Sequence, residues 1–196
     1  MLKALTLLGL LVVVSLALIG QRGKDTPQIT GDPSLQSYTA PTPDTLGATT
    51  NASDSSGLNI YQDEKQGFRI RYPGDISITK EDSGTVIFTK EGLSVAISAG
   101  KLSGKDTINT IAELAVNHKM EKMGERFKLL ETISPVSIGS LTGITFTAEE
   151  NSKEITYFYV PQKLGYLLIT NSTDTSDWDL ISTSDDIIYS LELLEG

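Results

Sequence analysis

The first twenty residues, MLKALTLLGLLVVVSLALIG, form the most apolar run of the chain. Residues 4–20 carry no charge, whereas Lys3 precedes them and Arg22 and Lys24 follow them. A helix of this length would span roughly 26 Å, slightly less than the ~30 Å hydrocarbon core of a bilayer. We interpret residues 1–24 as a signal anchor that forms a membrane helix, or as a signal peptide cleaved at about Ala17. The anchor is favoured because the apolar run continues past Ala17 without a break.

Residues 25–57 contain few large apolar residues, and these residues show no periodicity. Ser, Thr, Pro, Gly and Asp occupy 23 of these 33 positions. Such a segment buries too little apolar surface to offset the entropy of ordering it. We therefore expect a disordered linker between the leader and a head that spans residues 58–196.

In the first part of the head, apolar and polar residues alternate with the period of two that is typical of half-buried strands. The pattern predicts strands over residues 68–72, 76–79, 85–89 and 93–99. Glu81-Asp82-Ser83-Gly84 separates the second and third as a hairpin turn. Three antiparallel neighbours are the simplest interpretation of this part.

Residues 107–123 change to helical spacing, with Ile108, Ile111, Ala112 and Ala115 on one face. Asp106 or Thr107 precedes this helix as a capping residue, and Gly124 ends it. The apolar face becomes polar after the first half, so we expect only that half to pack firmly.

Strands resume in the second part of the head. They are predicted over residues 129–133, 136–138, 144–147, 155–160 and 166–170. ITYFYV at 155–160 and YLLIT at 166–170 are apolar at nearly every position, which is typical of central strands covered on both faces.

A terminal helix would cover the second face. Ser176 and Asp179 have the spacing of a capping box, and Leu180, Ile187, Leu191 and Leu194 share a helical face. The fold class that follows is α+β: a mostly antiparallel β-sheet covered by helices on both faces, an α-β-α sandwich.

Charge and cysteine content narrow the function classes. The 196 residues carry a formal net charge of −9 and contain no cysteine. Phosphate backbones repel such a head, so nucleic acid is not an expected partner, and anionic lipid headgroups would repel it as well. Without cysteine there is no disulfide, no thiolate metal site and no lipidated sulfur.

Few residues suggest chemistry. His118, the single histidine, is expected to be a boundary residue of the middle helix, with a catalytic role as the alternative. Asp174, Asp177 and Asp179 could hold Ca²⁺, although acids in a first helical turn more simply complement the helix dipole. The candidate partner-binding residues are Arg69, Arg71 and Trp178. Glu64 or Asp63 are the expected ion-pair partners of the two arginines. For Trp178, packing in the core or at the helix cap is the simpler role.

The order of landmarks in the head resembles the PsbP-like domain. They are Tyr61, Gly67-Phe68-x-Ile70-x-Tyr72-Pro73, a hairpin, a middle helix, Gly139-x-x-x-Gly143 before paired strands, and a terminal Ile188-Tyr189-Ser190-Leu191. Asp75-Ile76 stands where family members often carry Trp. The family includes the extrinsic photosystem II subunit and exported bacterial proteins. The resemblance implies an α-β-α sandwich with a docking or assembly role, and metal binding as a family theme.

The sequence contains no Gly-x-Ser-x-Gly elbow and no glycine-rich phosphate loop. We therefore expect a non-enzymatic domain that docks to a protein partner, held at the membrane by the N-terminal helix with its head outside the cytoplasm, or secreted if the leader is cleaved. A Ca²⁺- or Mn²⁺-binding photosystem-type subunit is the first alternative. An enzyme that uses His118 or the C-terminal acids is the second. Asn51 and Asn171 lie in glycosylation sequons, which we expect to be unused.

Overall fold

A computed structural model describes residues 48–53, 57–163 and 165–194, and for 48–53 only the backbone. The predicted leader and residues 25–47 lie outside the described residues. Among the helices that are described, none combines the length and the apolar character needed to cross a membrane.

The larger sheet has seven strands, and each neighbouring pair is antiparallel. Its order is β4 (Ser77–Lys80), β5 (Val86–Lys90), β6 (Leu93–Gly100), β10 (Gly165–Thr173), β9 (Lys153–Gln162), β8 (Leu141–Glu150) and β7 (Phe127–Ile138). β9 and β10 are thus interior strands, as their continuous apolar sequences predict. The mostly antiparallel sheet is confirmed.

A second sheet was not anticipated. It contains four strands in the order β1 (Ala48–Ser53), β2 (Asn59–Asp63), β3 (Phe68–Tyr72) and β11 (Glu192–Leu193). The single predicted sheet is therefore only part of the head: β4, β5 and β6 are antiparallel neighbours, whereas β3 pairs with β2 and β11. The linker boundary also changes, since residues 48–53 pair with β2 through their backbone, which requires no apolar side chains.

The middle helix is confirmed as α1 (Ile108–Met123). The Thr107 hydroxyl caps it by accepting a hydrogen bond from the Thr110 backbone N–H at 3.2 Å. Gly124 ends it with a φ of 56°, a conformation that favours glycine. Ala112 and Val116 are its buried residues, so the packed face is centred slightly later along the helix than expected.

The terminal helix α2 (Trp178–Tyr189) is shorter than predicted. Its cap is Asp177, whose carboxylate accepts hydrogen bonds from the backbone N–H groups of Asp179 and Leu180, so the capping box that starts at Ser176 is wrong. Ser190 ends the helix. Leu191 and Leu194 consequently lie beyond α2, and Leu191 is nevertheless buried in the core.

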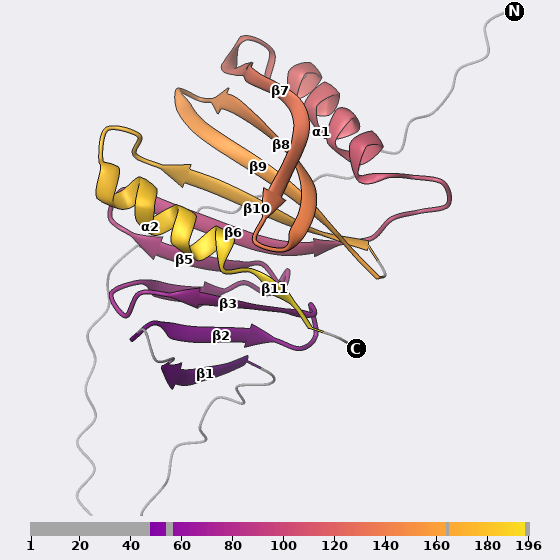
Figure 1. Cartoon of the computed structure of the whole chain (residues 1–196). Helices are drawn as coiled ribbons and strands as arrows, with labels where there is room; N and C mark the ends of the chain where they lie inside the picture. The colour runs from indigo at the N-terminus through magenta and orange to yellow at the C-terminus, as the bar shows by residue number, and fades with distance from the viewer. Residues whose placement is uncertain (1–47, 54–56, 164, 195–196) are drawn as a thin grey trace, which may run out of the picture. The chain divides into compact units, whose positions relative to one another are not determined.

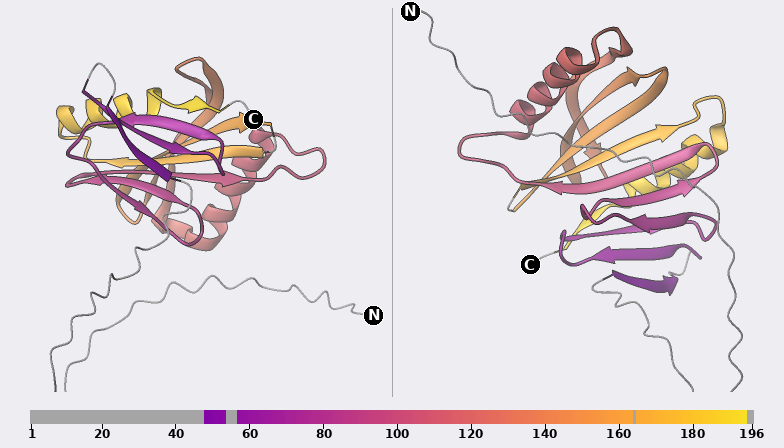
Figure 2. Two further views of the ribbon diagram at one scale, coloured as in Figure 1. Left: turned by 90° about the horizontal axis from the view of Figure 1, so that it is seen from below. Right: turned by 180° about the vertical axis from the view of Figure 1, so that it is seen from behind.

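The two helices cover opposite faces of the seven-stranded sheet, as Figures 1 and 2 show from the front and from behind. Tyr157 and Tyr159 of β9 belong to the core under α1, whereas Phe158 and Val160 belong to the core shared with α2 and the second sheet. The predicted covering by helices on both faces is thus confirmed, and the four-stranded sheet extends the cover on the α2 face.

β7 replaces two predicted strands. It runs continuously from Phe127 to Ile138, with two register irregularities against β8. Pro135 interrupts the sequence pattern but not the strand, because β7 lies at the sheet edge, where a missing backbone N–H breaks no ladder.

Candidate functional site

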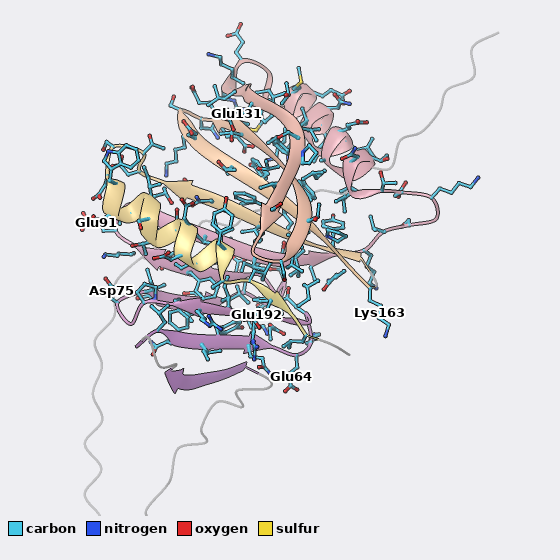
Figure 3. All side chains as sticks on the ribbon, in the orientation of Figure 1. Glu64, Asp75, Glu91, Glu131, Lys163 and Glu192 are labelled. Carbon is cyan, nitrogen blue, oxygen red and sulfur yellow. The ribbon has the colours of Figure 1, made fainter. Side chains whose placement is uncertain are left out.

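Arg69 and Arg71 lie on the exposed face of β3, and both pair with Glu192. Arg69 Nε donates to Glu192 Oε2 at 2.8 Å, and Arg71 Nη2 lies 3.3 Å from Glu192 Oε1. Figure 3 labels Glu192 on this four-stranded sheet, where it stands opposite Arg69 in the ladder with β11. The expected pairing with Glu64 or Asp63 is therefore wrong, because β11 reaches β3 from the far end of the chain.

Asp63 is instead fully buried and joins the two sheets. Lys80 Nζ of β4 lies 2.7 Å from Asp63 Oδ2, and the Gln66 side chain donates to the same oxygen at 3.1 Å. Burial alone would raise the pKa of the Asp63 carboxyl, but the hydrogen bonds from Lys80 and Gln66 outweigh it and hold this pKa below its usual value. Burial and the neighbouring Asp63 raise the pKa of Tyr61 to about 12. This arrangement is structural: it fixes β2 against β4.

Trp178 is 80% exposed at the first position of α2, so the expected core or capping packing is wrong. The reason is local. The cap at Asp177 starts the helix so that Leu180, Ile187 and Ile188 face the core, and Trp178 then points away from it. An indole with this exposure contributes little to the stability of the head.

The three acids proposed for Ca²⁺ have local bonds. The Asp174 carboxylate accepts hydrogen bonds from the Ser176 backbone N–H at 2.9 Å and from the Ser176 hydroxyl at 2.7 Å, and these bonds lower the pKa of Asp174. Asp177 caps α2, and Asp179 lies in its first turn. Within the described ranges, no three His, Asp or Glu side chains gather in a way that could hold a metal ion.

Next to Trp178 in the chain, the β10–α2 loop borders an open polar trough of ≈ 520 Å³. The trough also reaches the β5–β6 and β8–β9 turns, and much of its lining is hydroxyl groups, from Ser94, Ser152, Ser172, Thr173 and Thr175. A smaller hollow of ≈ 200 Å³ shares Glu154, Thr173 and Thr175 with it and continues toward α2. Sequence reasoning missed this surface, because it forms from three turns that are distant in the chain.

His118 lies on the exposed part of α1, beside a hollow of ≈ 430 Å³ that Lys119, Lys122, Met123 and Arg126 also line. This hollow is on the α1 face, whereas the C-terminal acids lie on or before α2. The two alternative enzyme sites, His118 and the C-terminal acids, therefore lie on different faces of the sheet and do not combine.

Of the two glycosylation sequons, the structure describes the asparagine side chain of one, Asn171. Asn171 of β10 donates to the Ser184 hydroxyl at 3.3 Å and accepts from the Thr173 hydroxyl at 2.6 Å, so its side-chain amide is engaged within the fold. The side chain of Asn51 lies outside the described residues.

No protein-family model and no curated protein sequence matches the chain. Among solved structures, cyanobacterial PsbP (CyanoP) from Synechocystis sp. PCC 6803 aligns with a TM-score of 0.54 at 13% identity, over 69% of this chain and 92% of that one. The head has a PsbP-like fold. Weaker similarities, both with TM-scores of 0.45, are to a protein of Bacteroides thetaiotaomicron VPI-5482 at 19% identity, over 66% of this chain and 46% of that one, and to LpqN of Mycobacterium tuberculosis at 14% identity, over 65% and 83%.

Proposed function

We propose that the PsbP-like head is a non-enzymatic domain that docks to a protein partner outside the cytoplasm, and that residues 1–24 tether it to the membrane. The observation that carries this proposal is the 80% exposure of Trp178. Tryptophan is among the residues most enriched at the energetic centres of protein interfaces, and a large aromatic side chain left in water is costly unless a partner covers it.

The size of the effect follows from the area. A tryptophan side chain buries ~200 Å² when covered, which at about 25 cal/mol per Å² is worth about 5 kcal/mol as an upper estimate. The adjacent hydroxyl-rich trough would supply the polar rim that surrounds such an anchor. The placement of His118 and the C-terminal acids on opposite faces of the sheet favours docking over catalysis.

Site-specific crosslinking in native cells tests this proposal. A photoreactive residue at position 178 of the full-length chain is expected to give a discrete heteromeric product that the same residue at Met120 does not give. Met120 is the matched control because it is also exposed, at 53%, but lies on α1. Products that contain only this chain, or the same products from both positions, would contradict the proposal.

The identified partner then provides a quantitative test. With the purified partner, Trp178→Ala is expected to weaken binding by about thirtyfold, the equivalent of an interface residue worth about 2 kcal/mol. Tyr189→Ala, at the other end of α2 and 45% exposed, is the control and should leave the affinity unchanged. An unchanged affinity for the Trp178 variant would refute the anchor.

A further inference from the structure

Basic side chains gather along one flank of α1 at its C-terminal end. His118 and Lys122 are four residues apart and so lie on the same side of the helix. Lys119 adjoins them, and Arg126 follows in the short helix η1 (Gly124–Arg126). Together with Met123 they line the hollow of ≈ 430 Å³. Such a concentration of positive charge opposes the net charge of −9 of the whole chain.

The cations of this basic hollow differ in whether an acidic side chain pairs with them. Lys119 Nζ lies 2.8 Å from Glu150 Oε1, bonds the Tyr157 hydroxyl at 3.0 Å and lies 4.9 Å from the centre of the Tyr157 ring. Across residues 57–163 and 165–194, by contrast, neither Lys122 nor Arg126 has an acidic side-chain partner. The hollow therefore keeps two full positive charges that nothing within the described fold neutralises.

A role in helix stability accounts for only part of this pattern. Lys122 lies in the last turn of α1, where a cation complements the helix dipole. Arg126 lies beyond the helix end, and His118 lies before its last turn. Stabilisation of the helix dipole therefore does not explain why His118, Lys122 and Arg126 surround one concave surface.

We propose that the basic hollow binds a ligand that carries a phosphate group. Two unneutralised cations match a dianion better than the single charge of a carboxylate. Arginine presents a planar fork that bonds phosphate oxygens in pairs, and lysine acts as a point charge beside it. Met123 offers an apolar wall to the carbon part of the ligand, and the volume falls within the ~300–1,000 Å³ of small-ligand sites.

The phosphate can come from a free phosphorylated compound or from the headgroup of an anionic lipid. Although the net charge of the head disfavours anionic membranes, two unpaired cations act over the short range at which such a headgroup would enter the hollow. The site is on α1 and does not depend on Trp178 or on the docking proposal.

Calorimetric titration with inorganic pyrophosphate tests the hollow directly. The full-length chain, reconstituted in phosphatidylcholine vesicles, is expected to bind pyrophosphate. Lys122→Gln with Arg126→Gln should weaken this binding about tenfold or more, because each substitution removes a charged hydrogen-bond donor while keeping a side-chain stem. Lys101→Gln with Lys105→Gln is the matched control: it also removes two positive charges, from exposed positions in the β6–α1 loop, and should change the affinity less than about twofold.

Two results would overturn the proposal: no heat of binding from the wild-type chain at about millimolar pyrophosphate, or an equal loss of affinity in both double variants. Because the first result comes from the unaltered chain, a folding defect in a variant cannot hide it. Repeating the titration in phosphatidylglycerol vesicles separates the sources. A lipid headgroup in the hollow would compete with pyrophosphate, so the wild-type affinity for pyrophosphate would fall in these vesicles while that of the Lys122/Arg126 double variant would not. An unchanged wild-type affinity identifies a free phosphorylated compound.

Discussion

Removing the cation that faces the buried Asp63 should destabilise the head far more than breaking an equally close ion pair at the surface. Asp63 is fully buried, and Lys80 Nζ approaches it to 2.7 Å. At this separation the attraction is about 6 kcal/mol for an effective dielectric constant of about 20. The Lys80 side chain is 34% exposed, so solvent screens part of this energy. We expect Lys80→Met to lower the free energy of unfolding by about 2–3 kcal/mol, because it leaves a carboxylate buried without its cation.

The matched control is Asp75→Asn. Asp75 and Lys90 are also 2.7 Å apart, but their side chains are 57% and 41% exposed. Ion pairs of this kind contribute little, because water solvates both partners before and after the pair forms. The urea midpoint of this variant should equal that of the wild type within error. Far-UV circular dichroism is the suitable signal, since the single tryptophan is already exposed in the folded head and reports poorly on unfolding.

The pH dependence of stability provides a second test of the Asp63–Lys80 pair. The folded pKa of Asp63 is lowered, so its contribution is complete above the unfolded value of about 3.9 and is lost as the pH falls through the folded pKa. The stability difference between wild type and Asp63→Asn should therefore be constant near neutral pH and shrink below about pH 4. Equal midpoint shifts for Lys80→Met and Asp75→Asn, or a difference that grows in acid, would refute the reasoning.

Three further outcomes are expected. Deletion of residues 1–24 should move the chain from the membrane fraction to the soluble fraction, and recovery of the full-length chain as soluble cytoplasmic protein would contradict the tether. Gly143→Ala should lower the unfolding free energy by about 2 kcal/mol or more, because the new Cβ would lie 2.5 Å from the Tyr159 carbonyl oxygen, whereas Gly74→Ala, with 3.7 Å of space, should be nearly neutral in the same urea assay. Tyr61 should resist ionisation in an ultraviolet titration up to about pH 12, and its effect on stability should appear as a loss between the unfolded pKa of about 10 and that value.

Periodicity predicted the elements whose burial alternates along the chain. Phe68, Ile70 and Tyr72 are buried while Arg69 and Arg71 are exposed, as a period of two requires. The same alternation could not reveal which sheet the strand joins, because each face pattern is compatible with any antiparallel neighbour. The second sheet consists mainly of the consecutive strands β1, β2 and β3, and β11 returns from the C-terminus to extend it, a contact that no local pattern encodes.

The candidate sites were less predictable for a related reason. Asp63 looked like a surface acid, since burial of a carboxylate depends on Lys80 and Gln66 arriving from other elements. Trp178 was expected to pack because it adjoins the helix cap. It lies two residues before Leu180, about 200° around the helix, so a helix that buries Leu180 turns Trp178 toward solvent.

The fold separates the two surfaces that the proposals concern. α1 and α2 cover opposite faces of one seven-stranded sheet (Figures 1 and 2). The basic hollow at the end of α1 and the exposed Trp178 at the start of α2 therefore do not face each other. The cores beneath them draw on alternate residues of the same central strands, with Tyr157 and Tyr159 on one side and Phe158 and Val160 on the other. A partner that covers Trp178 would therefore leave the hollow open. A phosphate group in the hollow would touch no residue of the docking surface, so the head could hold both at once.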